Sequence, residues 1–173
     1  MAYVGGLRAR LVKESLFQMV NNALEDLGWF DAGRQHSPIQ FLDKEVANDD
    51  EVPLNTLSLA DGDIVASALE MGSTLSEHSW AFYLDFFGES DVLSLDVSRD
   101  LKDILEGRMP SIGRVAPRFT VYDYTMATPP EIFVCDISGV SLDRAQNFPK
   151  PWQKYWRSVS FVVNDEYADE DDS

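Results

Sequence analysis

The sequence contains little cysteine, little histidine and few basic residues, and each shortage excludes a class of function. One cysteine, Cys135, occurs in 173 residues, which excludes an internal disulfide and a zinc site built from several thiolates. Two histidines, His36 and His78, are too few for a histidine-rich metal cluster. Fourteen Lys and Arg stand against 30 Asp and Glu, and the net charge of -16 argues against a protein that holds nucleic acid by neutralising phosphates.

Long apolar runs and common functional motifs are also missing. No stretch reaches the roughly 18 apolar residues of a membrane-spanning helix, and Arg8, Arg10 and Lys13 interrupt the N-terminal region before it could serve as a signal peptide. We therefore expect a soluble protein of a reducing compartment. The sequence has no phosphate-binding Gly-rich loop, no dinucleotide fingerprint, no His-Glu-x-x-His and no Gly-x-Ser-x-Gly. These absences count against the common nucleotide-binding and hydrolase families.

A few residues suggest chemistry at first sight, but each has a simpler interpretation. Ser76 and His78 could share a strand face, yet a catalytic triad is assembled in space, and a structural hydrogen bond at a strand start explains His78 better. Asp61-Gly62-Asp63 lacks the further acidic ligands of a calcium loop, so a turn is favoured. Cys135 lies in an apolar stretch and is expected to be an inert, small hydrophobic residue. We expect no catalytic residue, no metal and no cofactor, and hence a protein that is not an enzyme.

The negative charge is concentrated in two parts of the chain. Residues 1–42 hold four basic and four acidic groups, whereas residues 43–106 hold three basic and sixteen acidic groups, a balance of -13. Residues 107–163 reverse the sign with seven basic against four acidic groups, and residues 164–173 add six acids and no base. This pattern fits a solvated acidic face with a frayed acidic tail, or a surface that repels nucleic acid or meets a basic partner.

Apolar periodicity predicts a helix in the first part of the chain. Residues 7–27 carry apolar side chains at a spacing of three or four, and Gly28 stands where a left-handed C-cap residue is expected. A short apolar strand follows at residues 39–42. Residues 43–62 are polar and rich in turn-forming residues, which predicts a long exposed connection.

Strand patterns dominate the rest of the chain. Residues 63–73 and 77–90 predict a hairpin, and the second strand is apolar on both faces, which predicts a central strand covered on each side. A second helix is expected within residues 97–110, where Gly107 suits its end and Pro110 lies beyond. Further strands are expected at residues 118–126, 131–140 and 157–163. The prediction is one α+β domain over residues 1–163, a mostly antiparallel sheet with two main helices packed on it, followed by a flexible acidic tail at 164–173.

Cations and aromatic residues alternate in one segment, FPKPWQKYWR. The composition is compatible with stacking on nucleic-acid bases, but the overall acidity argues against that use. Two interpretations remain open. Either Trp152 and Trp156 anchor a loop onto the core, or the segment is a subunit interface, for which Trp, Tyr and Arg are typical anchors. The candidate interface residues are Trp152, Tyr155, Trp156 and Arg157.

Several phrases of the sequence resemble the tail terminator proteins of long-tailed, siphovirus-type bacteriophages, particularly those of actinobacterial phages. The resemblance is carried by GWFDAGR, EHSWAFYLDFFGES, VSRDLKDILEGRMPSIG, VYDYTMATPP and PWQKYWRSVSFVV, which together cover about two thirds of the chain. The acidic connection at 43–62 and the acidic C-terminus have no counterpart in this pattern. None of these segments contains a catalytic motif.

The resemblance implies a structural virion protein. Such a subunit forms a ring, commonly a homohexamer, that caps the head-proximal end of the tail tube, stops tube growth and joins the head in the neck of the particle. The implied partners are the major tail tube protein, the head–tail connector or head-completion protein, and the tape measure protein or DNA in the lumen, without specific binding and without a membrane. The implied location is the virion, after assembly in the host cytoplasm. A negative lumen would repel the DNA backbone.

Two alternatives are kept. The chain could be another head–tail joining protein, such as a connector or head-completion protein. It could also be an acidic mimic of DNA that occupies the basic groove of a nucleic-acid-binding protein, using the same acidic residues on a convex surface. In the ring-forming case, subunits are expected to associate through exposed sheet edges and the aromatic–cationic segment, with the acidic residues 43–106 of a neighbour as electrostatic complement.

Overall fold

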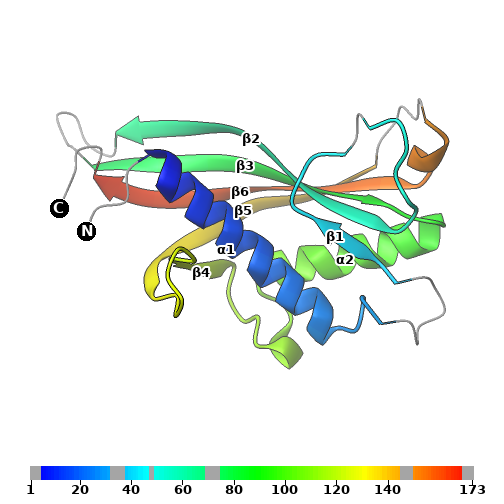
Figure 1. The fold of residues 1–173 in the computed structure, drawn as a ribbon, viewed down its shortest axis with the longest axis horizontal. Helices are drawn as coiled ribbons and strands as arrows, with labels where there is room; N and C mark the ends of the chain where they lie inside the picture. The colour runs from blue at the N-terminus through cyan, green and yellow to red at the C-terminus, as the bar shows by residue number, and fades with distance from the viewer. Residues whose placement is uncertain (1–4, 32–37, 47–48, 69–74, 145–149, 169–173) are drawn as a thin grey trace.

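The computed structural model describes residues 5–31, 38–46, 49–68, 75–144 and 150–168, and every structural statement below concerns these residues. Two α-helices pack on a six-stranded sheet (Figure 1). The helices are α1 (Gly5–Asp26) and α2 (Asp91–Glu106). In chain order, the strands are β1 (Gln40–Leu42), β2 (Thr56–Ala68), β3 (Leu75–Phe87), β4 (Arg118–Tyr122), β5 (Glu131–Arg144) and β6 (Trp156–Ala168).

The strands lie in the order β1-β2-β3-β6-β5-β4. Only the short β1–β2 pair is parallel, and the other four pairs are antiparallel. The predicted class, α+β with a mostly antiparallel sheet and two main helices packed on it, is therefore confirmed. Short 3-10 turns, η1 (Pro110–Ile112) and η2 (Pro151–Gln153), precede β4 and β6.

Both helices cover the same face of the sheet, which we call the helix face. One apolar cluster joins Leu16 of α1 and Leu101 of α2 to Phe82 of β3 and Phe161 of β6, and each of these side chains is at most 2% exposed. In Figure 1, α1 crosses the long strands diagonally. The apolar stripe of each helix is therefore buried against the alternate, inward-pointing residues of the strands, as amphipathic patterning requires.

The helix ends are determined by local capping. Gly28 and Gly107 both have a positive φ, 77° and 72°, as the predicted C-cap positions require. A Cβ at Gly107 would lie 2.2 Å from the backbone of Ala116, so only glycine fits there. The second helix begins earlier than residue 97, because Ser90 is its N-cap and accepts a hydrogen bond from the Leu93 amide at 3.2 Å.

Strand β3 is central, as predicted, and pairs with β2 and β6. Its inward residues Trp80, Phe82, Leu84 and Phe86 are buried. The expected cover on both faces is found only at one end, because Tyr83 on the opposite face is 41% exposed whereas Phe87 is fully buried. The face opposite the helices is therefore partly open.

The predicted exposed connection at 43–62 is wrong in two respects. Strand β2 begins at Thr56, so the last part of this segment belongs to the sheet. Val46 and Val52 are buried in a small second cluster with Phe87 and Trp152. The few apolar residues of this polar stretch pack over the sheet, and their number is too small for a periodic signal.

The predicted boundary between domain and tail at residue 163 is also wrong. Strand β6 continues to Ala168, and its residues 164–168 pair with β3. Asp165 forms an ion pair with Arg8 at 2.5 Å, with both side chains only 11% exposed. The rest of the predicted tail, His36 and the turn of the β2–β3 hairpin lie outside the described residues.

Candidate functional site

The aromatic–cationic segment spans η2 and the start of β6, at the end of the sheet where the connection at residues 43–55 covers the face opposite the helices. Trp152 is 9% exposed and lies edge-on to Phe87, with ring centroids 4.9 Å apart. Its indole Nε1 donates a hydrogen bond to the Asp50 carbonyl at 3.3 Å. The segment thus holds the connection against the sheet.

Trp156 and Asp85 make a polar contact beside the same cluster. The Trp156 indole Nε1 donates to Oδ1 of Asp85 at 3.1 Å, and its ring lies 5.2 Å from that of Phe87. Asp85 is 7% exposed. Burial raises the pKa of its carboxyl, and hydrogen bonds from Trp156 and Ser158 partly offset the rise.

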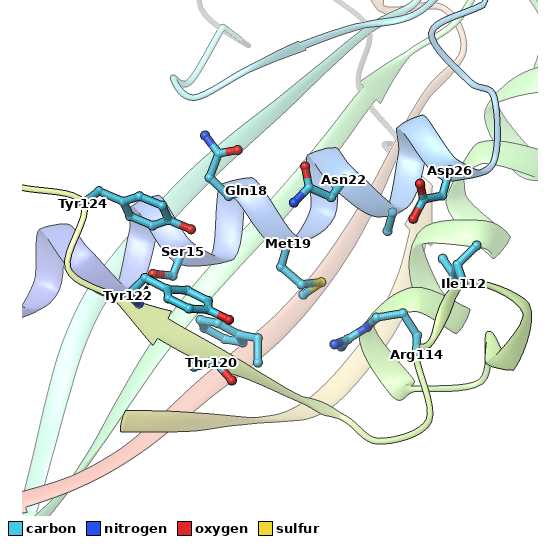
Figure 2. Close-up of a pocket in the computed structure, with 12 residues that line it drawn as sticks. Ser15, Gln18, Met19, Asn22, Asp26, Ile112, Arg114, Thr120, Tyr122 and Tyr124 are labelled. Carbon is cyan, nitrogen blue, oxygen red and sulfur yellow. Dashed lines mark hydrogen bonds between the residues drawn. The ribbon is translucent and has the colours of Figure 1, made fainter. Parts of the chain in front are cut away.

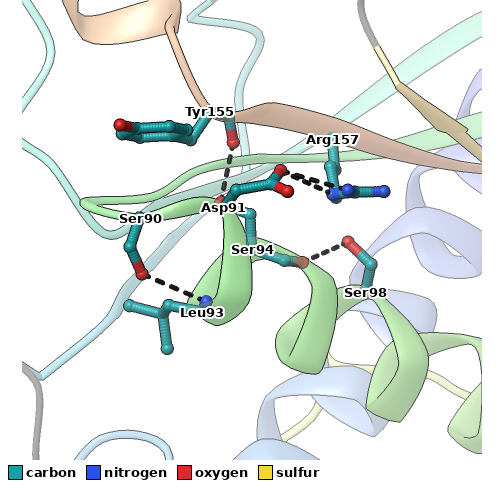
Figure 3. Close-up of polar contacts among 7 residues, drawn as sticks. All are labelled: Ser90, Asp91, Leu93, Ser94, Ser98, Tyr155 and Arg157. Atoms are coloured by element: carbon teal, nitrogen blue, oxygen red, sulfur yellow. Dashed lines mark hydrogen bonds and ion pairs between the residues drawn. The ribbon is translucent and has the colours of Figure 1, made fainter.

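Two further contacts tie the segment to the start of α2 (Figure 3). Arg157 donates from Nη2 and Nε to Oδ1 of Asp91, at 3.0 and 3.3 Å. The Ser94 hydroxyl donates to the Tyr155 carbonyl at 2.7 Å. The carboxylate of Asp91 also lies in the first turn of α2, where a negative charge is favoured by the helix dipole.

These contacts show that Trp152 and Trp156 anchor the segment on the core of their own chain, the first of the two interpretations drawn from the sequence. Asp85 and Asp91 belong to the acidic residues 43–106, so the acidic complement expected from a neighbouring subunit is supplied within one chain. Tyr155 is half-buried and Lys154 is exposed, with its ammonium 5.2 Å from the Tyr155 ring. A subunit contact through this segment stays a prediction, and these two residues are its accessible part.

The sheet face opposite the helices, which we call the open face, is partly uncovered. Ala60, Tyr83 and Ser160 form one row across β2, β3 and β6. Val134 of β5 points to the same side, because its neighbour Cys135 points into the core, and Val134 is 51% exposed. Small residues and exposed apolar groups therefore make a flat surface that other proteins can reach.

A pocket with a volume of about 260 Å³ lies between α1 and β4 (Figure 2). From α1, it is lined by Ser15, Gln18 and Asn22, whose spacing of three and four places them on one helix side. Tyr122 and Tyr124 line it from β4 and the following turn. This polar stripe was visible in the sequence but was missed, because the helix was assigned from its apolar positions alone.

Arg114 lies at one end of this pocket and points into the space between α1 and β4 (Figure 2). Its Nε donates to the Ile104 carbonyl at 3.2 Å and its Nη1 to the Arg118 carbonyl at 2.8 Å. Burial lowers the pKa of this guanidinium. Both acceptors are backbone groups, so Arg114 fixes the loop between α2 and β4.

The residues considered for chemistry are separated in the structure. Asp61 pairs with Lys13 at 2.9 Å, whereas His78 is half-buried in β3. Burial of the Lys13 ammonium alone would lower its pKa, but the charges and hydrogen bonds of Asp61 and Asp43 together raise it. Cys135 is fully buried, and burial raises the pKa of its thiol, which suppresses thiolate chemistry. Within the described ranges, no three His, Cys, Asp or Glu residues gather in a group that could hold a metal ion.

Comparisons with known proteins assign the chain to no family. No protein-family model matches the chain, and the search of curated proteins finds no match. Among the helices of the described part, none is both long and apolar enough to cross a membrane.

Proposed function

We propose that this protein is a structural virion subunit that forms a ring at the head-proximal end of a phage tail tube. The ring stops tube growth and offers the head-joining surface, with DNA passing through its lumen. The sequence phrases that resemble tail terminators support this proposal. A second support is independent of them and lies in the open face.

The open face carries the proposal. A sheet covered by helices on one side can stand alone, and its other side is then available for a second protein. Tyr83 and Val134, 41% and 51% exposed, are the exposed large apolar residues on this face of the strands, and the half-buried Ala81 and Val162 lie on the same face. We assign this face to the contact with an adjacent ring, either of tube protein or of connector.

The charge distribution fits passage of DNA. Residues 43–106 carry a balance of -13, and Asp49, Asp50 and Glu51 of this region are exposed. Negative groups at a lumen repel phosphates and prevent a passing duplex from binding. We assign the lumen to this acidic part of the chain.

Electron microscopy of purified tails tests the proposal. When wild-type protein is added to tail tubes, we expect it to form a ring at the head-proximal ends of the tubes. The Tyr83→Asp variant places a charge on the open face and should no longer bind the tube ends, whereas Met126→Asp, at a site 55% exposed in the β4–β5 connection, should bind like wild type. If Tyr83→Asp still binds the tube ends, the open face is not the surface that contacts the tube.

The same samples decide between this function and the alternatives. A position elsewhere in the particle, such as the connector, would overturn the terminator assignment. A monomer that ignores tubes and inhibits a DNA-binding enzyme would favour the DNA-mimic alternative. The readout is the position of the added protein in micrographs, together with nuclease activity in its presence.

A further inference from the structure

The two edges of the sheet differ in how well they are closed. Strand β1 pairs only with residues 56–58 of β2, so residues 59–68 have β3 on one side and, among the described residues, no strand on the other. In Figure 1, β2 runs along one border of the sheet. In this stretch alternate residues point their backbone groups away from β3, and the Gly62 carbonyl accepts a hydrogen bond from the Trp80 indole. The remaining outward groups of an edge strand are a template for pairing with another chain unless something covers them.

The β4 edge is closed by its own chain. The Tyr122 amide donates to the hydroxyl of Ser15 on α1 at 3.0 Å, and the Arg118 carbonyl accepts from Arg114. A partner strand cannot add along β4 without displacing these groups. Of the two edges, the β2 edge is therefore the one that is accessible to a partner strand.

Acidic side chains flank the open β2 edge. Asp43 and Asp61 share a single ammonium, that of Lys13, at 3.6 and 2.9 Å. Glu45 and Lys44 are exposed beside them, so the three carboxylates of Asp43, Glu45 and Asp61 stand against the two cations Lys13 and Lys44, and one negative charge remains uncompensated. We call β1, residues 43–45 and the outer side of β2 the acidic edge.

The segment that leads into β4, at the other edge of the sheet, carries positive charge. Residues 107–118, which lead into β4, contain Arg108, Arg114 and Arg118 and no acidic residue. The side chains of Arg108 and Arg118 are 67% and 63% exposed. Between them stands Val115, which is 75% exposed and the most exposed large apolar residue described. We call residues 107–118 the basic segment.

We propose that copies of this chain associate head to tail, with the basic segment of one copy seated on the acidic edge of the next. The contact covers the open edge of β2 and buries Val115. It also brings the carboxylates of the acidic edge to Arg108 and Arg118, whose own ion pairs, with Glu106 at 3.1 Å and with Asp136 at 3.9 Å, are exposed. A contact between two acidic edges would instead oppose like charges, which disfavours a two-fold dimer. Because the two surfaces are different patches, the contact is heterologous and generates a ring when the rotation closes.

This inference rests on the proposed ring function and specifies its interface. A stable contact of this kind is expected to bury more than about 1,000 Å². It also separates two tasks of the subunit. The edges join copies within a ring, and the open face meets the next ring.

Charge reversal on one surface at a time tests the contact. The double variant R108E/R118E should not assemble, because its basic segment becomes acidic, and D43K/E45K should not assemble for the converse reason. An equimolar mixture should assemble, because each reversed surface then meets a reversed partner and each native surface a native one. Sedimentation velocity with and without tail-tube ends measures the oligomer, and assembly of the mixture should match that of wild type.

Each outcome is decisive. Rescue by mixing is expected only when the basic segment and the acidic edge face each other. A two-fold contact between the same two patches would stop at a dimer, whereas the heterologous contact gives closed rings, and the sedimentation coefficient separates the two. Rings formed by R108E/R118E alone would overturn the proposed surfaces while leaving the ring function intact. Absence of wild-type rings, even with tube ends, would overturn the ring function itself. Circular dichroism of each variant checks the fold, which exposed ion pairs such as those of Arg108 and Arg118 stabilise only weakly.

Discussion

The two faces of the sheet differ although the same strands build both. On the helix face, Phe82 and Phe161 stack with ring centroids 5.8 Å apart and are at most 2% exposed. On the open face, Tyr83 is 41% exposed and its neighbour across the strands is Ser160. Consecutive residues of β3 therefore serve opposite purposes. Apolar burial on one face stabilises the fold, and the other face stays partly exposed.

The open face is itself divided. Near Phe87, residues 43–46, residues 49–55 and η2 cover it, and the cover includes the partly buried Trp156 and the buried Asp85. Toward Tyr83 and Val134 it is bare. A polar pair enclosed under a loop contributes to stability only while both members are present, since a buried group without its partner is costly. The comparison of covered and uncovered parts yields four predictions.

The largest effect is expected on the helix face. Phe82→Ala should lower the free energy of unfolding by about 3–5 kcal/mol, because it removes a fully buried ring and leaves a cavity. A domain of this size has a total stability of about 5–15 kcal/mol, so the variant should be marginal. Urea unfolding measures the loss. The matched control, Tyr83→Ala at the next residue, should cost much less, and equal losses would refute the contrast between the faces.

A smaller loss is expected at the covered end of the open face. Trp156→Phe keeps an aromatic ring beside Phe87 but removes the donor to Asp85, which should cost about 1–3 kcal/mol. Tyr155→Phe is the control, because the hydrogen bond between Tyr155 and Ser94 uses the backbone carbonyl of Tyr155. Thermal unfolding of the two variants compares them. Equal melting temperatures would mean that the indole hydrogen bond does not stabilise this cover.

The helix that covers the sheet depends on its cap. Ser90→Ala removes the acceptor of the Leu93 amide and should cost about 1 kcal/mol. Ser141→Ala, at an exposed position of β5, should leave stability nearly unchanged. Chemical denaturation with both variants measures the difference. A Ser90→Ala protein as stable as wild type would show that tertiary packing alone determines where α2 begins.

The smallest effect concerns Asp85 and depends on pH. Burial raises the pKa of the Asp85 carboxyl in the folded state above the ordinary 3.8, so the native state holds the proton of this carboxyl more tightly than the unfolded state does. The free energy of unfolding therefore falls as the pH rises from the unfolded-state pKa to the folded-state pKa. Asp85→Asn keeps an oxygen acceptor for Trp156 and removes the charge. The variant should gain stability over wild type as the pH rises from 4 to 7. A difference in melting temperature that does not change with pH would contradict this.

Periodicity in the sequence was enough to predict the type and approximate position of most helices and strands. The apolar spacing in residues 7–27 predicted α1, and the alternation around Trp80 and Phe82 predicted the central strand. Gly28 and Gly107 marked helix ends, because a positive φ favours glycine. The same local rules missed Ser90 as the start of α2, although its side chain is a preferred N-cap.

Longer-range features were decided by the tertiary structure. Val46 and Val52 read as part of an exposed loop, since two valines in a polar stretch give no period, yet they close a cluster with Trp152. The partners of Trp156 and Arg157 lie 71 and 66 residues away, at distances that no local pattern reports.

The sequence by itself determined the composition-level properties of this protein: its acidity, its single cysteine and the type and order of most helices and strands. Only the tertiary structure decided which sheet edge is left unpaired, which face is bare and which charges are already compensated within the chain. The physical reason is that periodicity and capping depend on neighbours within a few residues. Strand order, burial and ion pairing depend on chain segments that meet only after folding, such as Arg8 and Asp165 at the two ends of the described chain.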